Sequence, residues 1–102
     1  MRIRTVSENK CFNGVQKVCS HDSHVLDCNM QFSIFMPENA ERELCPIIFW
    51  LSGLTCTEEN FTVKAGAQKY AAKKNLIIVA PDTSPRGQSI PDDEAYDFGQ
   101  GA

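Results

Sequence analysis

The fold is decided by the stretch Pro46-Ile47-Ile48-Phe49-Trp50-Leu51-Ser52-Gly53-Leu54-Thr55-Cys56. Its first half, Pro46–Leu51, is a continuous apolar run, which is typical of a strand covered on both faces of a parallel sheet. Its second half is a loop of small and hydroxyl-bearing residues that leads toward a helix start at 57–61. This order predicts an α/β protein with a functional loop at the carboxyl end of a buried strand.

A second apolar run, Leu76–Ala80, predicts a second strand of the same kind. Between the two runs, apolar residues recur at helical spacing and predict a helix with one apolar stripe. Thr62 is the expected cap of this helix, and Asn75 its expected end. Strand, helix and strand at this spacing form a βαβ crossover. The predicted stripe consists of Val63, Ala67, Tyr70, Ala71 and the stem of Lys74.

The residues before this unit predict antiparallel β structure. Apolar residues alternate with polar ones over 26–36 and indicate a half-buried strand. Val15–Cys19 is a shorter candidate strand, which lies between turn signals at Asn13-Gly14 and His21–Ser23. The predicted organisation is therefore a β meander over 1–36, a βαβ unit over 46–80 and a loop over 81–102.

Composition excludes several classes of protein. The chain has 102 residues, 42% hydrophobic and 23% charged, so we expect one soluble globular domain at most. A net charge of −3 gives no electrostatic reason to expect binding to nucleic acid or to an anionic membrane. The N-terminus lacks the apolar core of a signal peptide, so we expect a cytoplasmic protein. The five cysteines are odd in number and form no C-x-x-C motif, which favours reduced thiols.

One cluster raises the question of a metal. It has the pattern C-x-H-x2-H-x3-C and consists of Cys19, His21, His24 and Cys28. Tetrahedral zinc accepts two cysteines and two histidines, but this spacing fits no common zinc finger. The cluster also spans a predicted turn, so we interpret it as a hairpin tip with exposed histidines and predict no metal site.

Three longer motifs, taken in order, carry a resemblance to a known family. They are Leu51–Thr57 with Glu59-Asn60-Phe61, then Pro81–Gly87, then Asp97–Ala102. Together they resemble the N-terminal part of the S-formylglutathione hydrolase family, also called esterase D, over essentially the whole chain. The resemblance implies the N-terminal part of an α/β-hydrolase fold, incomplete here, because complete family members are more than twice this length.

The resemblance also implies a reaction. Family members are serine esterases that hydrolyse S-formylglutathione to formate and glutathione, through a formyl-enzyme on the serine. It implies no metal and no organic cofactor, a small glutathione thioester as partner, and a homodimer for the complete enzyme. The family's G-x-S-x-G nucleophile elbow, Asp and His fall beyond residue 102, so the triad is absent from this chain and we expect the chain alone to be inactive.

The resemblance places one part of the catalytic machinery in this chain, an oxyanion loop. Leu54 is the expected backbone N–H donor and Gly53 the hinge that turns it inward, the alternative being a plain strand-ending turn. Cys56 is expected either at the rim of the substrate site or as a small buried filler. Arg86 could contact a glutathione carboxylate, although we favour a pairing with Asp82 or another nearby acid.

Three hypotheses about the chain stay open. It is a part of the hydrolase, a non-catalytic short isoform, or a small βαβ module that binds a nucleotide. The third is weak because the crossover carries neither G-x-G-x-x-G nor a P-loop. In addition, one helix must cover several strands, so we expect exposed apolar surface at Ile47–Leu51 and Leu76–Ala80.

Overall fold

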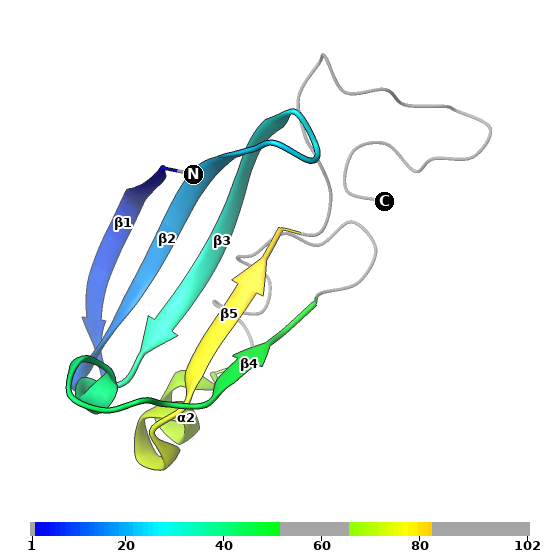
Figure 1. Ribbon diagram of the computed structural model, residues 1–102. Helices are drawn as coiled ribbons and strands as arrows, with labels where there is room; N and C mark the ends of the chain where they lie inside the picture. The colour runs from blue at the N-terminus through cyan, green and yellow to red at the C-terminus, as the bar shows by residue number, and fades with distance from the viewer. Residues whose placement is uncertain (1, 52–65, 83–102) are drawn as a thin grey trace.

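A computed structural model describes residues 2–51 and 66–82 of the chain. Five strands form one sheet in the order β1-β2-β3-β5-β4, as Figure 1 shows. A short 3-10 helix, η1, and one α-helix, α2, complete the described part. In chain order the elements are β1 (Ile3–Cys11), β2 (Gly14–Ser23), β3 (Cys28–Met36), η1 (Glu38–Glu41), β4 (Ile47–Phe49), α2 (Gln68–Lys74) and β5 (Ile77–Pro81).

The sheet changes from antiparallel to parallel pairing within this chain. Strands β1, β2 and β3 form an antiparallel meander, and β3 pairs with β5 in the antiparallel sense. Strands β4 and β5 pair in parallel. The predicted α/β class, an antiparallel start that leads into a parallel pair, is therefore confirmed. Because β5 lies between β3 and β4, β4 is an edge strand of the described sheet.

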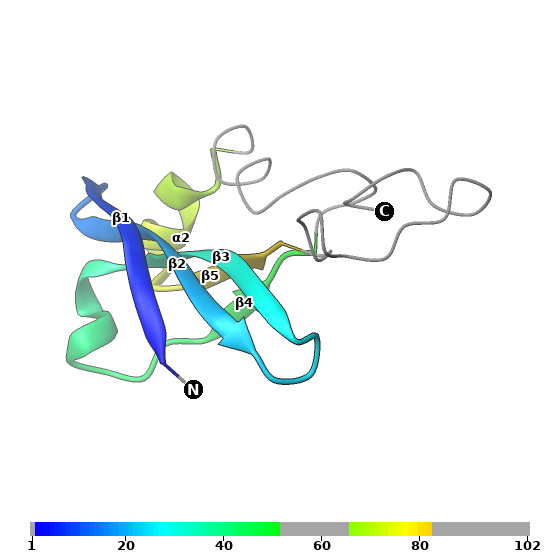
Figure 2. The same ribbon diagram turned by 90° about the horizontal axis from the view of Figure 1, so that it is seen from above.

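The core lies between the sheet and α2. Phe35 on β3, Ala71 on α2 and Ile78 on β5 form a buried cluster, and Figure 2 shows α2 over one face of the sheet. Phe35 pairs with Ile78 across the sheet, so both side chains point to the same face, the Phe35 face. The opposite face, which we call the Phe32 face, carries Phe32, Ile34, Phe49 and Val79.

The predicted turn at His21–Ser23 is wrong. These residues belong to β2, where His21 pairs with Met30 and Asp22 with Asn29. The Asn29 amide donates to the His21 carbonyl at 3.3 Å and to the Asp22 carboxylate at 3.3 Å, which holds the hairpin together up to its tip. The turn follows instead over 24–27, where Asp27 has a φ of 51°.

The helix is confirmed at its C-terminal end, but its predicted start and one position of its stripe are wrong. The helix α2 begins at Gln68 with Ala67 as its N-cap, after Gly66 at a φ of 63°, so Thr62 does not cap it. Asn75 adopts a left-handed conformation and ends α2, as predicted, with Lys73 and Lys74 in the last turn. Tyr70, expected in the apolar stripe, is 70% exposed. The helix packs on the sheet through the small side chain of Ala71, which follows Tyr70 in the sequence. Because consecutive helical residues point in different directions, Tyr70 points away from this contact. Thr62 and Val63 lie outside the described residues.

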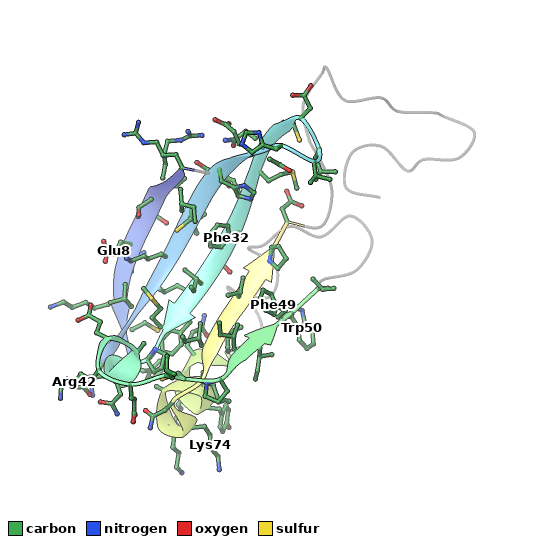
Figure 3. The ribbon with its side chains drawn as sticks, viewed as in Figure 1. Glu8, Phe32, Arg42, Phe49, Trp50 and Lys74 are labelled. Atoms are coloured by element: carbon green, nitrogen blue, oxygen red, sulfur yellow. The ribbon has the colours of Figure 1, made fainter. Side chains whose placement is uncertain are left out.

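The two apolar runs differ in solvent exposure. The run at Ile47–Leu51 is expected to be covered on both faces, but its residues are all exposed, since β4 lies at the sheet edge. This agrees with the expected apolar edge, and Figure 3 shows Phe49 and Trp50 beside β4. The expectation of exposed apolar surface is wrong for Leu76–Ala80. Ile78 and Ala80 are buried because β5 lies between two other strands.

Candidate active site

The carboxyl ends of β4 and β5 lie side by side. The two strands are parallel, with Phe49 opposite Val79 in the register, and Figure 1 shows their arrows pointing the same way. The segment that begins at Leu51 therefore leaves the sheet next to the segment that begins at Asp82. In α/β sheets, ligands bind outside the carboxyl ends of the strands, so this edge is the candidate active site.

Backbone hydrogen bonds hold both departure points. The Trp50 N–H donates to the Val79 carbonyl at 2.9 Å, which continues the β4–β5 ladder one residue past the end of β4. The Asp82 N–H donates to the Gln31 carbonyl at 2.9 Å, which extends the β3–β5 pairing in the same way. Both segments thus start from backbone that is fixed on the neighbouring strand.

The four site residues named from the sequence lie beyond these departure points. Gly53, Leu54 and Cys56 follow β4, and Arg86 follows β5, but all four lie outside the described residues. Their roles therefore stay predictions. The alternative pairing of Arg86 with Asp82 is untested for the same reason.

An open apolar cavity of about 300 Å³ lies on the Phe32 face at this same end of the sheet. Aromatic and aliphatic side chains from four strands line it, together with Asp82. Such a lining suits an apolar group of a ligand rather than a charged one. The lining residues are His21, Ser23, Leu26, Met30, Gln31, Phe32, Phe49, Val79, Pro81 and Asp82.

Sequence reasoning missed this cavity, and His21 shows why. His21 was expected at an exposed hairpin tip, yet its ring lies 6.0 Å from that of Phe32, tilted by 59°. Its Nδ1 atom is buried and has no hydrogen-bond partner among the described residues. The contact depends on the β2–β3 register, in which His21 faces Met30 two residues from Phe32. The alternating pattern reveals the faces of one strand but not this register.

The zinc alternative gains no support. Within residues 2–51 and 66–82, no three His, Cys, Asp or Glu side chains gather closely enough to hold a metal ion. Cys19 is buried in β2, and the four cysteines in the described part of the chain are free thiols. In the same ranges, no helix is long and apolar enough to cross a membrane.

Comparison with known proteins gives the family. A protein-family model described as "Putative esterase" matches residues 23–102. The chain belongs to this esterase family.

Individual proteins similar to this chain are described by a more specific activity. This esterase chain is 52% identical to the S-formylglutathione hydrolase of Rattus norvegicus and 50% identical to that of Bos taurus, over its whole length. An S-formylglutathione hydrolase structure from Agrobacterium tumefaciens superposes with a TM-score of 0.89 at 41% identity, covering 96% of this chain. The chain spans 36% of the length of each of these relatives, so they extend well beyond the matched region.

Proposed function

We propose that this chain forms the oxyanion-loop part of an S-formylglutathione hydrolase, a serine esterase that converts S-formylglutathione to formate and glutathione. The geometric observation that carries the proposal is that the carboxyl ends of the parallel strands β4 and β5 lie side by side. The identity of 52% with the rat enzyme, spread over the whole chain, supports the choice of substrate. No observation favours a nucleotide-binding module.

The proposed chemistry is acyl transfer through a serine. The serine oxygen attacks the formyl carbon while a histidine takes the serine proton. The C–S bond then breaks, glutathione leaves with that proton, and water hydrolyses the formyl-enzyme to formate. The serine, histidine and aspartate are proposed to come from the region of the relatives that this chain does not match. No metal or cofactor takes part in the scheme.

Leu54 is the proposed contribution of this chain to that chemistry. The carbonyl oxygen becomes negatively charged in the tetrahedral intermediate and needs two donors aimed at its position. In this fold one donor follows the nucleophile, and the other comes from the loop after the strand that corresponds to β4. We assign the second donor to the Leu54 N–H, with Gly53 as the hinge. One such donor is worth about 3 kcal/mol of transition-state stabilisation.

Cys56 and Arg86 are proposed at the margin of the same site. Cys56 lies two residues past the proposed donor, which would bring its thiol close to the sulfur of the substrate. Arg86 follows β5, and its guanidinium could pair with a glutathione carboxylate. We further propose that the protein acts in the cytoplasm, where its cysteines stay reduced, and that the complete enzyme is a homodimer.

A chimaera tests the proposal. The region of the rat enzyme that matches this chain is replaced by residues 1–102, and hydrolysis is measured on S-formylglutathione, S-acetylglutathione and p-nitrophenyl acetate. The proposal predicts saturable turnover with the highest kcat/KM on S-formylglutathione. A folded chimaera that hydrolyses only p-nitrophenyl acetate would refute the substrate, and one that hydrolyses none of the three would refute the esterase role.

A further inference from the structure

Two sulfur atoms meet on the Phe32 face of the β2–β3 hairpin. Cys28 and Met30 lie two residues apart on β3, so their side chains point to the same face of the sheet. The Cys28 thiol donates a hydrogen bond to the Met30 thioether, with 3.6 Å between the two sulfur atoms. Met30 is 8% exposed, and Cys28 is half-buried. The two sulfurs therefore form a largely enclosed pair that shares one proton, which a cation can replace.

An imidazole nitrogen without a partner lies opposite this pair. His21 pairs with Met30 in the β2–β3 register, which places their Cβ atoms about 5 Å apart on the same face. The His21 Nδ1 atom is buried and has no hydrogen-bond partner within residues 2–51 and 66–82. A buried polar atom left without a partner points to a bound ion or water molecule. The hairpin thus brings a thiol, a thioether and an imidazole nitrogen together.

These three donors suit a soft monovalent cation. Thiolate and thioether sulfur select Cu(I), and imidazole also binds copper. Two sulfurs bound to one metal ion at about 2.3 Å stand about 3.8–4.0 Å apart for tetrahedral or trigonal angles. The sulfur atoms of Cys28 and Met30 are within a few tenths of an ångström of that separation. Zinc takes Cys, His, Asp and Glu ligands, and no three of these gather in the described part of the chain.

The open cavity on the Phe32 face gives an ion a path to these donors. His21 and Met30 both line this cavity of about 300 Å³. Its described lining contains no Lys or Arg side chain that would repel a cation. A Cu(I) ion and one thiolate together carry no net charge, so the occupied site is compatible with the apolar lining. An entry path of this kind is one requirement of a metal site.

We infer that Cys28 Sγ, Met30 Sδ and His21 Nδ1 form a three-coordinate Cu(I) site that is separate from the proposed esterase chemistry. Binding replaces the thiol proton by the metal ion and releases that proton to solvent, while copper stays monovalent. The cysteine and histidine pattern of the sequence gave only part of this set, because the third ligand is a methionine. His24 is exposed, and Cys19 lies one position further along the hairpin, opposite Phe32.

Competition with a chromogenic chelator tests the inference. Residues 1–102 are titrated with Cu(I) under anaerobic conditions in an excess of bicinchoninate, and we expect one tight site per chain. The same chain with 13C-methyl methionine is then titrated with Ag(I), a redox-inert analogue of Cu(I). The Met30 methyl resonance should shift with the first equivalent, whereas that of Met36, at the other end of β3, should not.

Matched variants identify the ligands. Met30→Leu keeps a similar side-chain volume but removes the thioether. It should raise the Kd for Cu(I) about tenfold or more, because loss even of a group behind a metal ligand costs that much. Met36→Leu should leave the Kd unchanged. Cys28→Ser should remove the tight site and Cys45→Ser should keep it, while His21→Gln should weaken it. Circular dichroism checks that each variant keeps the fold of the parent chain.

Three results would overturn the inference. Equal effects of Met30→Leu and Met36→Leu would exclude the thioether as a ligand. Equal effects of Cys28→Ser and Cys45→Ser would show that copper binds the thiols without discrimination. A Met30 methyl resonance that stays in place when Ag(I) binds would put the ion elsewhere. The readout is metal binding, so the result of the chimaera assay has no bearing on it.

Discussion

The backbone N–H of Trp50 donates a 2.9 Å hydrogen bond to the carbonyl oxygen of Val79. This bond fixes the end of β4 against β5 one residue before Leu51, after which the candidate oxyanion loop begins. Catalytic donors must be held near their productive positions, and a loop anchored on a sheet begins from a defined point. The edge strand is therefore also the anchor of the proposed site.

The first prediction concerns the core. Phe35 is 1% exposed and packs against Ala71 and Ile78, whereas Phe49 is 66% exposed. In the isolated chain, Phe35→Leu should lower the free energy of unfolding by about 1–2 kcal/mol. Phe49→Leu should change it by less than about 0.5 kcal/mol. Urea denaturation followed by circular dichroism measures both, and equal losses would contradict the assigned core.

The second prediction compares two glycines. A Cβ on Gly14 would collide with the Met36 carbonyl and lie 2.9 Å from Phe35 Cζ, so Gly14→Ala should destabilise the chain by about 1–3 kcal/mol. Gly66 has open space but a φ of +63°, so Gly66→Ala should lose about 1 kcal/mol. Asparagine tolerates that backbone conformation.

Gly66→Asn should therefore regain stability relative to Gly66→Ala, whereas Gly14→Asn should be no better than Gly14→Ala. Thermal unfolding of the four variants tests this ordering. The reverse order at position 14 would mean that the β2–β3 packing differs from the structure.

The sequence predicted which segments form strands better than it predicted how those strands are ordered and buried in the sheet. Alternation over 26–36 and the apolar run at 76–80 are local patterns, and both became strands. The insertion of β5 between β3 and β4 depends on pairing between distant segments, and this decides that Ile78 is buried while Phe49 is exposed. The cavity beside His21 depends on the hairpin register and left no sign in the sequence.

The candidate site could be predicted only as motifs that follow strands. The apolar runs located the two strand ends, and the parallel pairing of β4 and β5 brings those ends together. The positions of Gly53, Leu54, Cys56 and Arg86 lie outside the described residues, so their geometry remains a prediction. Tyr70 illustrates a further limit, since it belongs to the predicted apolar stripe and is nevertheless exposed. Helical periodicity predicts a stripe of apolar residues but not which of them contact the sheet.

The third prediction concerns Asp22. The amide of Asn29, and secondly the guanidinium of Arg4, hold the pKa of the Asp22 carboxyl below its usual value. Asn29→Ala and Arg4→Gln should each raise this pKa, as measured by an NMR titration of the carboxyl carbon. High salt should reduce the effect of Arg4 and leave that of Asn29.

The sign of the linked stability follows from the direction of this shift. A carboxyl whose pKa is lowered in the folded state stabilises that state above the pKa of the unfolded chain. This contribution is lost as the pH falls through the folded-state pKa. The acid limb of the stability curve should therefore flatten in Asn29→Ala, and a steeper limb would contradict the assignment.

The fourth prediction concerns Cys56 in the chimaera. Cys56→Ser should keep most of the S-formylglutathione hydrolase activity, because the thiol supplies neither nucleophile nor base. The same variant should become insensitive to iodoacetamide. Loss of turnover in a folded variant would show a chemical role for the thiol, and continued inactivation by iodoacetamide would place the sensitive cysteine elsewhere.

The most direct test of the oxyanion assignment is the kcat of the chimaera carrying Gly53→Val, measured on S-formylglutathione beside the parent chimaera. A branched side chain at the hinge would misdirect the Leu54 N–H and remove one donor to the oxyanion. The account predicts that kcat falls about a hundredfold while the fold and KM stay close to those of the parent. An unchanged kcat in the folded variant would contradict the claim that this loop stabilises the transition state.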